Sequence, residues 1–405
     1  MKVLHINQSD IGGGAAIAGY RLHQGLLAQG IHSRQLVGHK ETNSDLVAEV
    51  PRSRHLEKNI DRITRRLGFN YISHQTTPNI TQHPFYPEAD ILNFHNLHGG
   101  YFNYLAIDNL TTSKPALFTL HDMWSFTGHC AYSYACNKWQ TGCGQCPDLA
   151  TYPAITRDTT AIEWKLKNWV YSRSNLSIIT PSQWLADQAR ASMLSRFPIH
   201  HIPNGIDTDV YQPIENAQCR QVLNIPQGKH VLMFGAASLS DTRKGGDLLH
   251  KALVGLPESL KANTILLTLG RGGEAMGETI GIPSINLGYV GSDHLKAIAY
   301  SAADLFLFPT RADNLPLVLQ ESMACGTPMI SYKMGGVPDL VRPGKTGYLA
   351  APEDTEDFRN GIIQVLEDPD LLCQMAQNCR AIALAEYRIE QQADRYIALY
   401  QELLK

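Results

Sequence analysis

The sequence lacks any run of apolar residues long enough to cross a bilayer. A membrane-spanning helix needs about 18 consecutive apolar residues, whereas the longest candidates here are strand-length runs such as residues 231–234. Residues 1–7 are apolar for only a few positions before Asp10, which is typical of a buried first strand and not of a signal peptide. We therefore expect a cytoplasmic protein, with contact at the inner face of a membrane as the alternative to a fully dissolved one.

The chain also lacks the excess of positive charge that nucleic-acid-binding proteins usually carry. Its 35 Lys and Arg residues are outnumbered by 38 Asp and Glu residues, giving a formal net charge of −3. A protein whose main partner is nucleic acid normally needs a basic excess to neutralise phosphates. We expect no nucleic-acid partner, so any anion-binding site must be local.

The 405 residues are too many for one hydrophobic core. A first strand leads into glycines 12–14 and then into a helical pattern, which is a strand, glycine loop and helix unit. Other apolar runs predict strands of parallel sheets at 31–37, 91–94, 116–120, 177–180, 230–234, 264–269, 285–287, 305–308 and 328–331. Residues 201–207, rich in turn formers, interrupt this pattern. We expect two Rossmann-like α/β domains, 1–205 and 206–386, and a terminal helix at about 387–405 that could return to the first domain.

The densest candidate site is a loop that follows the predicted strand 305–308. It carries Asp313 and Asn314, and Glu321 lies eight residues after Asp313 in a predicted helix. In open α/β sheets ligands bind outside the carboxyl ends of strands, and free N–H groups at a helix N-terminus favour phosphate. From spacing alone, a capped helix with a salt-bridged acid explains the same residues equally well.

This stretch resembles the signature of glycosyltransferase family 4, a family of retaining enzymes with the GT-B fold. Matching segments extend over nearly the whole chain, at 12–14, 119–122, 181–184, 203–207, 243–246, 287–290 and 335–339. The resemblance implies two doubly wound domains facing across a cleft, the first binding an acceptor and the second a nucleotide-sugar donor. It implies retaining, metal-independent transfer of a hexose, with UDP-glucose or another UDP-hexose as donor and a saccharide or lipid-linked acceptor. The Cys-rich segment after His121 makes it similar to enzymes of bacterial exopolysaccharide biosynthesis, of the colanic-acid and heterocyst-envelope types.

The resemblance also assigns roles in the second domain by position. It places Glu321 on the ribose hydroxyls, and Asp313 with the amides of Asn314 and Leu315 at the donor sugar and diphosphate. The cations of Lys244 and Arg243 would neutralise the diphosphate, because the leaving group gains negative charge in the transition state. The backbone at Tyr289 and Val290 would contact the base.

In the first domain the resemblance assigns Gly13, Gly14 and His121. The glycines would let the phosphates approach without a Cβ in the way, and His121 would lie beside the reacting sugar. A lone histidine at a strand end is otherwise more often structural. The predicted catalytic set is therefore Asp313, His121, Glu321 and Lys244.

The chain departs from the family pattern at two positions. The family usually has glutamate where this chain has Asp313, and arginine where it has Ser238, six residues before Lys244. Arg243 could supply the missing charge. No side chain stands out as the covalent nucleophile that a double displacement would require.

Four of the eight cysteines fall within one short stretch, at Cys130, Cys136, Cys143 and Cys146. Four thiolates can close a tetrahedral structural zinc site. Free buried thiols or reversible disulfides explain the cluster equally well.

Residues 52–66 carry six basic and two acidic side chains, and Leu56, Ile60, Ile63 and Leu67 share one helical face. Such a helix either packs on its own domain or docks on an anionic membrane surface.

Two other enzyme classes and a non-catalytic zinc-bearing binding protein are alternatives. A nucleotide-sugar epimerase could use the same scaffold, but it needs an acid–base pair at the sugar, and none is evident beyond Asp313. An NAD-dependent oxidoreductase is suggested only by the glycine loop, where Ile17 stands in place of the last glycine of Gly-x-Gly-x-x-Gly. The binding protein would leave Arg243, Lys244 and the acidic residues unexplained.

Overall fold

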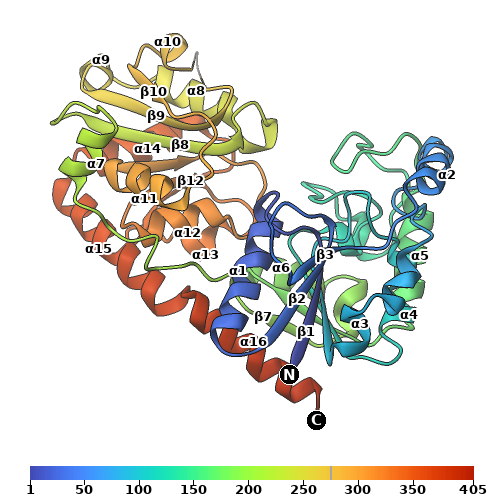
Figure 1. Cartoon of the computed structure of the whole chain (residues 1–405). Helices are drawn as coiled ribbons and strands as arrows, with labels where there is room; N and C mark the ends of the chain where they lie inside the picture. The colour runs from blue at the N-terminus through green and yellow to red at the C-terminus, as the bar shows by residue number, and fades with distance from the viewer. Residues whose placement is uncertain (274–275) are drawn as a thin grey trace. The chain divides into compact units, whose positions relative to one another are not determined.

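The computed structural model describes residues 1–273 and 276–405, except for the side chains of residues 54–56. The chain forms two compact units, one of Met1–Gly205 with Glu390–Lys405 and the other of Ile206–Ile389. Each unit is built on its own sheet, and the colours of Figure 1 separate the two sheets as blue to green and yellow to orange. Because every strand pairs in parallel with its neighbours, consecutive strands need crossover connections, and helices supply most of them.

The sheet of the first unit has seven strands in the order β3-β2-β1-β4-β5-β6-β7. The strands are β1 (Lys2–Ser9), β2 (His32–His39), β3 (Val47–Glu49), β4 (Ile91–Phe94), β5 (Ala116–Thr119), β6 (Leu176–Thr180) and β7 (Ile199–His201). Every residue of β4, β5 and β6 is buried. Burial on both faces explains why these strands are mainly apolar and do not alternate regularly between apolar and polar residues.

The helices of the first unit are α1 (Gly14–Ala28), α2 (Arg54–Arg66), α3 (Phe85–Glu88), α4 (Ile107–Leu110), α5 (Thr160–Tyr171), α6 (Gln183–Arg190) and the terminal α16 (Ile389–Leu403). Although α16 ends the chain, it packs in the core of this first unit. The hydroxyl groups of Tyr396 and Tyr400 lie 3.0 Å from Thr119 Oγ1 and 3.2 Å from Asn93 Nδ2 respectively.

The sheet of the second unit has six strands in the order β10-β9-β8-β11-β12-β13. They are β8 (His230–Ser238), β9 (Thr264–Arg271), β10 (Ser284–Asn286), β11 (Leu305–Phe308), β12 (Met329–Tyr332) and β13 (Gly347–Ala350). The helices are α7 (Asn216–Val222), α8 (Gly246–Val254), α9 (Glu258–Lys261), α10 (Met276–Ile280), α11 (Asp293–Ala302), α12 (Leu317–Ala324), α13 (Val337–Leu340), α14 (Thr355–Leu366) and α15 (Pro369–Glu386). The α/β class predicted from the sequence is confirmed, while β3, β7 and β13 were not predicted.

Helix α2 forms within the basic segment, where the sequence predicts a helix. Its apolar face is only partly buried against the rest of the first unit. Ile63 is 62% exposed and Leu67 is 48% exposed, whereas the side chain of Leu56 lies outside the described residues. Packing on its own unit therefore does not account for the whole face. Across the described part of the chain, no helix combines the length and the apolar character that crossing a membrane requires.

Candidate functional site

The loop after β11 is held between two glycines that have positive φ angles. Gly245 (φ +72°) packs so closely that an added Cβ would lie 1.9 Å from the carbonyl oxygen of Pro309. Gly335 (φ +52°) would place a Cβ 2.0 Å from the carbonyl oxygen of Asp313. No other residue fits at either position without moving the backbone, so the two glycines fix this loop at the carboxyl end of the sheet.

Asp313 accepts hydrogen bonds from two cations that are distant in the sequence. Its Oδ2 lies 2.6 Å from Lys244 Nζ and 3.1 Å from Arg243 Nη1. The backbone supports this contact, because Arg243 Nη1 also donates to the carbonyl of Ala312 at 2.8 Å and Arg311 N donates to the carbonyl of Arg243 at 2.8 Å. The structure thus brings together three residues that the sequence analysis assigned to the diphosphate and sugar.

The charges of this cluster are strongly coupled. Burial alone would raise the pKa of Asp313, but the charges of Lys244 and Arg243 together with hydrogen bonds hold that pKa below its usual value. Burial also lowers the pKa of Lys244, and the attraction of Asp313 offsets only part of this effect. Arg243 Nη2 also lies 3.6 Å from Asp241 Oδ2, so the two cations are balanced by two carboxylates. An anionic ligand would be held by the ammonium and guanidinium groups themselves and not by a net positive charge of the cluster.

Three other assigned residues of the second unit belong to this loop or to the helix α12 that follows it. Glu321 lies on α12 and is only 4% exposed, and it accepts a hydrogen bond from the Tyr300 hydroxyl at 3.3 Å. The Asn314 backbone N–H donates to Asp313 Oδ1 at 3.1 Å, so in this structure that amide serves Asp313 itself. Leu315 is buried.

Tyr289 and Val290, assigned to the base, follow β10. The Val290 side chain is buried, while Tyr289 is 63% exposed, and the guanidinium of Arg271 lies 5.5 Å from the centre of its ring. An exposed aromatic ring beside a cation offers a stacking surface for a planar ligand.

The glycine loop of the first unit leaves open space at the start of α1. An added Cβ at Gly13 or Gly14 would meet no atom within 4 Å. Gly13 also has a φ angle of +94°, which residues other than glycine rarely adopt. The loop is anchored by Asp10, whose carboxylate accepts hydrogen bonds from Thr42 N and Oγ1 at 2.9 and 2.7 Å.

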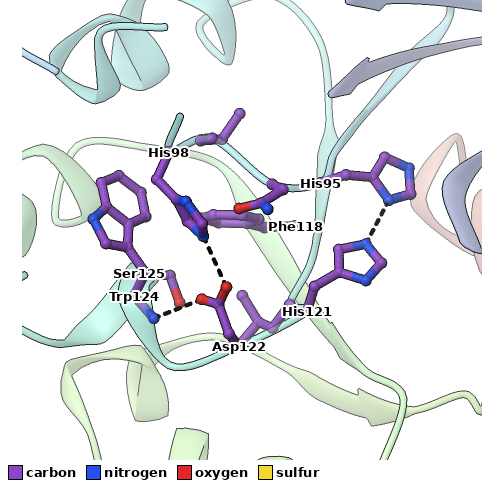
Figure 2. A pocket seen from close by; sticks show the side chains of 10 residues that line it. His95, His98, Phe118, His121, Asp122, Trp124 and Ser125 are labelled. Atoms are coloured by element: carbon purple, nitrogen blue, oxygen red, sulfur yellow. Dashed lines mark hydrogen bonds and ion pairs between the residues drawn. The ribbon is translucent and has the colours of Figure 1, made fainter. Parts of the chain in front are cut away.

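His121 lines a small pocket of the first unit (Figure 2). It follows β5, and His95 and His98 follow the neighbouring strand β4, so their side chains meet at one edge of the sheet. The carboxylate of Asp122 accepts a hydrogen bond from the Trp124 backbone N–H at 2.9 Å and lies 2.8 Å from His98 Nε2. Burial lowers the pKa of His121 to about 4, so this ring is neutral at neutral pH.

His95 and His98 were not predicted as site residues from the sequence. His95 directly follows the fully buried strand β4 and His98 lies three residues later, in the same kind of loop that drew attention to His121. That shared position was the signal that could have identified them, since carboxyl ends of adjacent parallel strands meet at one edge.

The zinc interpretation of the four cysteines stays a prediction. All four are free thiols, and within residues 1–273 and 276–405 no three His, Cys, Asp or Glu side chains are placed to hold a metal ion. Burial raises the pKa of Cys130 to about 12 and that of Cys143 to about 11, which favours the protonated form. Cys143 Sγ instead accepts a hydrogen bond from Gly128 N at 3.2 Å, which is a role in loop packing.

Two family models match the chain, one in each half. Residues 12–210 match the family described as Glycosyltransferase Family 4, and residues 216–382 match the one described as Glycosyl transferases group 1. WcaC of Escherichia coli strain K12, named for a glycosyl transferase role in colanic acid biosynthesis, is 26% identical over 436 residues covering 100% of both chains.

Solved structures share the fold over the whole chain. Sucrose-phosphate synthase from Thermosynechococcus elongatus has a TM-score of 0.73 at 19% identity, covering 100% of this chain and 99% of the other. HepE from Anabaena, in complex with UDP and glucose, has a TM-score of 0.70 at 17% identity, covering 99% of this chain and 100% of the other. The predicted GT-B fold is confirmed.

Proposed function

The two halves of this chain belong to the Glycosyltransferase Family 4 and glycosyl transferases group 1 families, and from that premise we propose the reaction of this enzyme. It transfers a hexose from a UDP-hexose, UDP-glucose first among them, to a saccharide or lipid-linked acceptor in exopolysaccharide biosynthesis. The configuration at the anomeric carbon is retained, and no metal takes part.

The observation that carries this proposal is the convergence of Lys244 and Arg243 on Asp313, in the loop that leads into the helix of the buried Glu321. The cations are fixed before any ligand arrives, so they can stabilise a diphosphate as its charge grows. A UDP donor is supported by HepE, which has been solved with UDP and with UDP-glucose. The exopolysaccharide role is supported by the name of WcaC.

In this reaction the bond between the anomeric carbon and the diphosphate oxygen breaks, and the acceptor oxygen forms a bond to that carbon on the same face. The acceptor proton passes to the departing diphosphate. Lys244 and Arg243 hold the diphosphate, Asp313 orients the sugar, and Glu321 binds the ribose. We assign acceptor binding to the first unit, where His121 contacts the reacting sugar and Gly13 and Gly14 leave room for phosphates without a Cβ in the way.

The test is calorimetric binding of UDP, GDP and NAD in the presence of EDTA, followed by incubation with UDP-glucose. We expect UDP alone to bind, and NMR to show UDP release with α-glucose as the first sugar formed by slow hydrolysis. First formation of β-glucose would contradict retention. A changed nucleotide sugar without UDP release would favour an epimerase, and binding of NAD alone would favour an oxidoreductase.

Contact with an anionic membrane is a second part of the proposal, and the exposed face of α2 supports it. Ile63 and Leu67 are exposed beside Arg62, Arg65 and Arg66, a combination suited to the surface of an anionic bilayer. Reversal of the three arginines to glutamate should abolish binding to phosphatidylserine-containing vesicles in flotation assays. The matched control reverses the same amount of charge on the second unit, at the exposed residues Lys251, Lys333 and Lys345. Equal binding of both variants would refute membrane contact through α2.

A further inference from the structure

Three histidines from neighbouring parts of one sheet form a hydrogen-bonded row that ends at the pocket. His5 Nδ1 lies 2.9 Å from His95 Nε2, and His95 Nδ1 lies 3.1 Å from His121 Nε2. The rings are stacked with centroids 5.2 and 5.4 Å apart. The strands β1, β4 and β5 are adjacent in the sheet, and Figure 2 shows the contact between His95 and His121.

All three rings are neutral at neutral pH. Burial lowers the pKa of His5 and of His95 well below the usual value, and it lowers that of His121 to about 4. A neutral imidazole has one N–H donor and one bare nitrogen acceptor. Each ring in the row must therefore donate in the same direction, so the protons point either all toward His121 or all toward His5.

His5, at the end of the row away from the pocket, distinguishes these two arrangements. His5 Nε2 is buried and has no hydrogen-bond partner. If the protons pointed inward, this atom would be an N–H donor with no acceptor. Buried N–H groups without an acceptor are rarer in proteins than buried acceptors without a donor. The arrangement in which all protons point toward His121 is therefore favoured.

We propose that His5 and His95 are positioning residues that fix His121 in the tautomer with its proton on Nδ1 and a bare Nε2 facing His95. Held in this way, His121 acts toward the reacting sugars as a hydrogen-bond donor through Nδ1 and not as a general base. This role in the reaction rests on the proposed function, whereas the tautomer itself does not. It agrees with transfer of the acceptor proton to the leaving diphosphate.

The tautomer can be measured without activity. The ligand-free protein is labelled with ¹⁵N-histidine, and long-range ¹H–¹⁵N correlation spectra are recorded, with the His121 signals identified by their loss in His121→Asn. We expect the chemical shift of a protonated Nδ1 and a bare Nε2. A protonated Nε2 at His121 would overturn the proposal, whether or not the protein transfers sugar.

The positioning role is tested with two substitutions of equal size at His95. In His95→Asn the amide can still donate to His121 Nε2, whereas the ionised carboxylate of His95→Asp can only accept and draws the proton onto Nε2. We expect kcat to fall on the order of 100-fold in His95→Asp and to stay within about threefold in His95→Asn, with the KM for UDP-glucose little changed in both.

Two controls separate this effect from misfolding and from failure of the proposed function. His74→Asn changes another buried histidine, which contacts Glu57 and lies outside the row, and it should leave kcat unchanged. UDP binding reports the integrity of the second unit. Equal kcat in His95→Asp and His95→Asn would overturn the positioning role, while a wild-type protein that neither binds UDP nor releases it from UDP-glucose would refute the proposed function and leave the tautomer result standing.

Discussion

Removing the ammonium group of Lys244 gives the sharpest test of the donor site. Lys244 Nζ lies 2.6 Å from Asp313 Oδ2, and its side chain is 18% exposed. A hydrogen bond between charged groups contributes about 1.5–3 kcal/mol, and because Arg243 remains in Lys244→Met we take about 2 kcal/mol. At about 1.4 kcal/mol per factor of ten, the Kd for UDP should rise roughly 30-fold.

The negative charge of Asp313 should also affect the affinity for UDP, and a double variant separates this effect from the loss of the lysine. In Lys244→Met only Arg243 neutralises this carboxylate, so it repels the diphosphate more strongly. The double variant Lys244→Met/Asp313→Asn should therefore bind UDP more tightly than Lys244→Met. Calorimetric titration with UDP in EDTA measures all of these affinities.

The matched control for this experiment is Arg311→Met. Arg311 belongs to the same loop, but its guanidinium pairs with Asp247 and Glu353 at 2.7 and 3.0 Å. We expect its Kd for UDP to stay within about twofold of wild type. Wild-type affinity in folded Lys244→Met, or an equal loss in Arg311→Met, would refute the assignment of Lys244 to the diphosphate.

Four further predictions follow from the same geometry. Asp313→Asn should lower kcat by more than tenfold in a UDP-release assay while its calorimetric affinity for UDP is retained or improved, and equal losses of both would make Asp313 a scaffold residue. Glu321→Ala should weaken binding of UDP but not of inorganic diphosphate, because we assign it to the ribose; equal weakening of the two in calorimetry would contradict this. Gly14→Val should keep the melting temperature, since the added Cβ meets no atom within 4 Å, and should raise the KM for UDP-glucose; an unchanged KM would remove Gly14 from the site. Burial lowers the pKa of His121 from 6.5 to about 4, so the unfolded state binds the proton first as pH falls. The free energy of unfolding should therefore decrease by about 1 kcal/mol per pH unit between these two pKa values. Thermal melts of His121→Asn should show a shallower decline of stability with falling pH than wild type, and an equal decline would contradict the buried neutral ring.

The parallel α/β fold was predictable because its central strands are buried on both faces. Strands such as β4, β5 and β11 are short, mainly apolar runs, and this pattern can be recognised without knowing the neighbouring strands. The strands that were missed, β3, β7 and β13, lie at the edges of their sheets and are only partly buried. An edge strand forms mainly because it pairs with its neighbour in the sheet, so its own residues give little basis for predicting it from the sequence.

The candidate site was only partly predictable, for a related reason. Asp313 and Glu321 lie on one loop and the helix that follows it, so their spacing and the family resemblance pointed to them together. The spacing of the four cysteines left zinc, free thiols and disulfides open, because the positions of the Sγ atoms depend on how the loop folds.

The sequence by itself therefore determined the elements, the order of the motifs and the kinds of side chain available for chemistry. Tertiary structure decided which of them meet. Lys244 reaches Asp313 across 69 positions because β8 and β11, whose carboxyl ends carry the two loops, are adjacent in the sheet. His5, His95 and His121 form one row because β1, β4 and β5 are neighbours. Strand order results from how crossovers pack apolar faces over the whole domain, and no local stretch of the sequence contains that information.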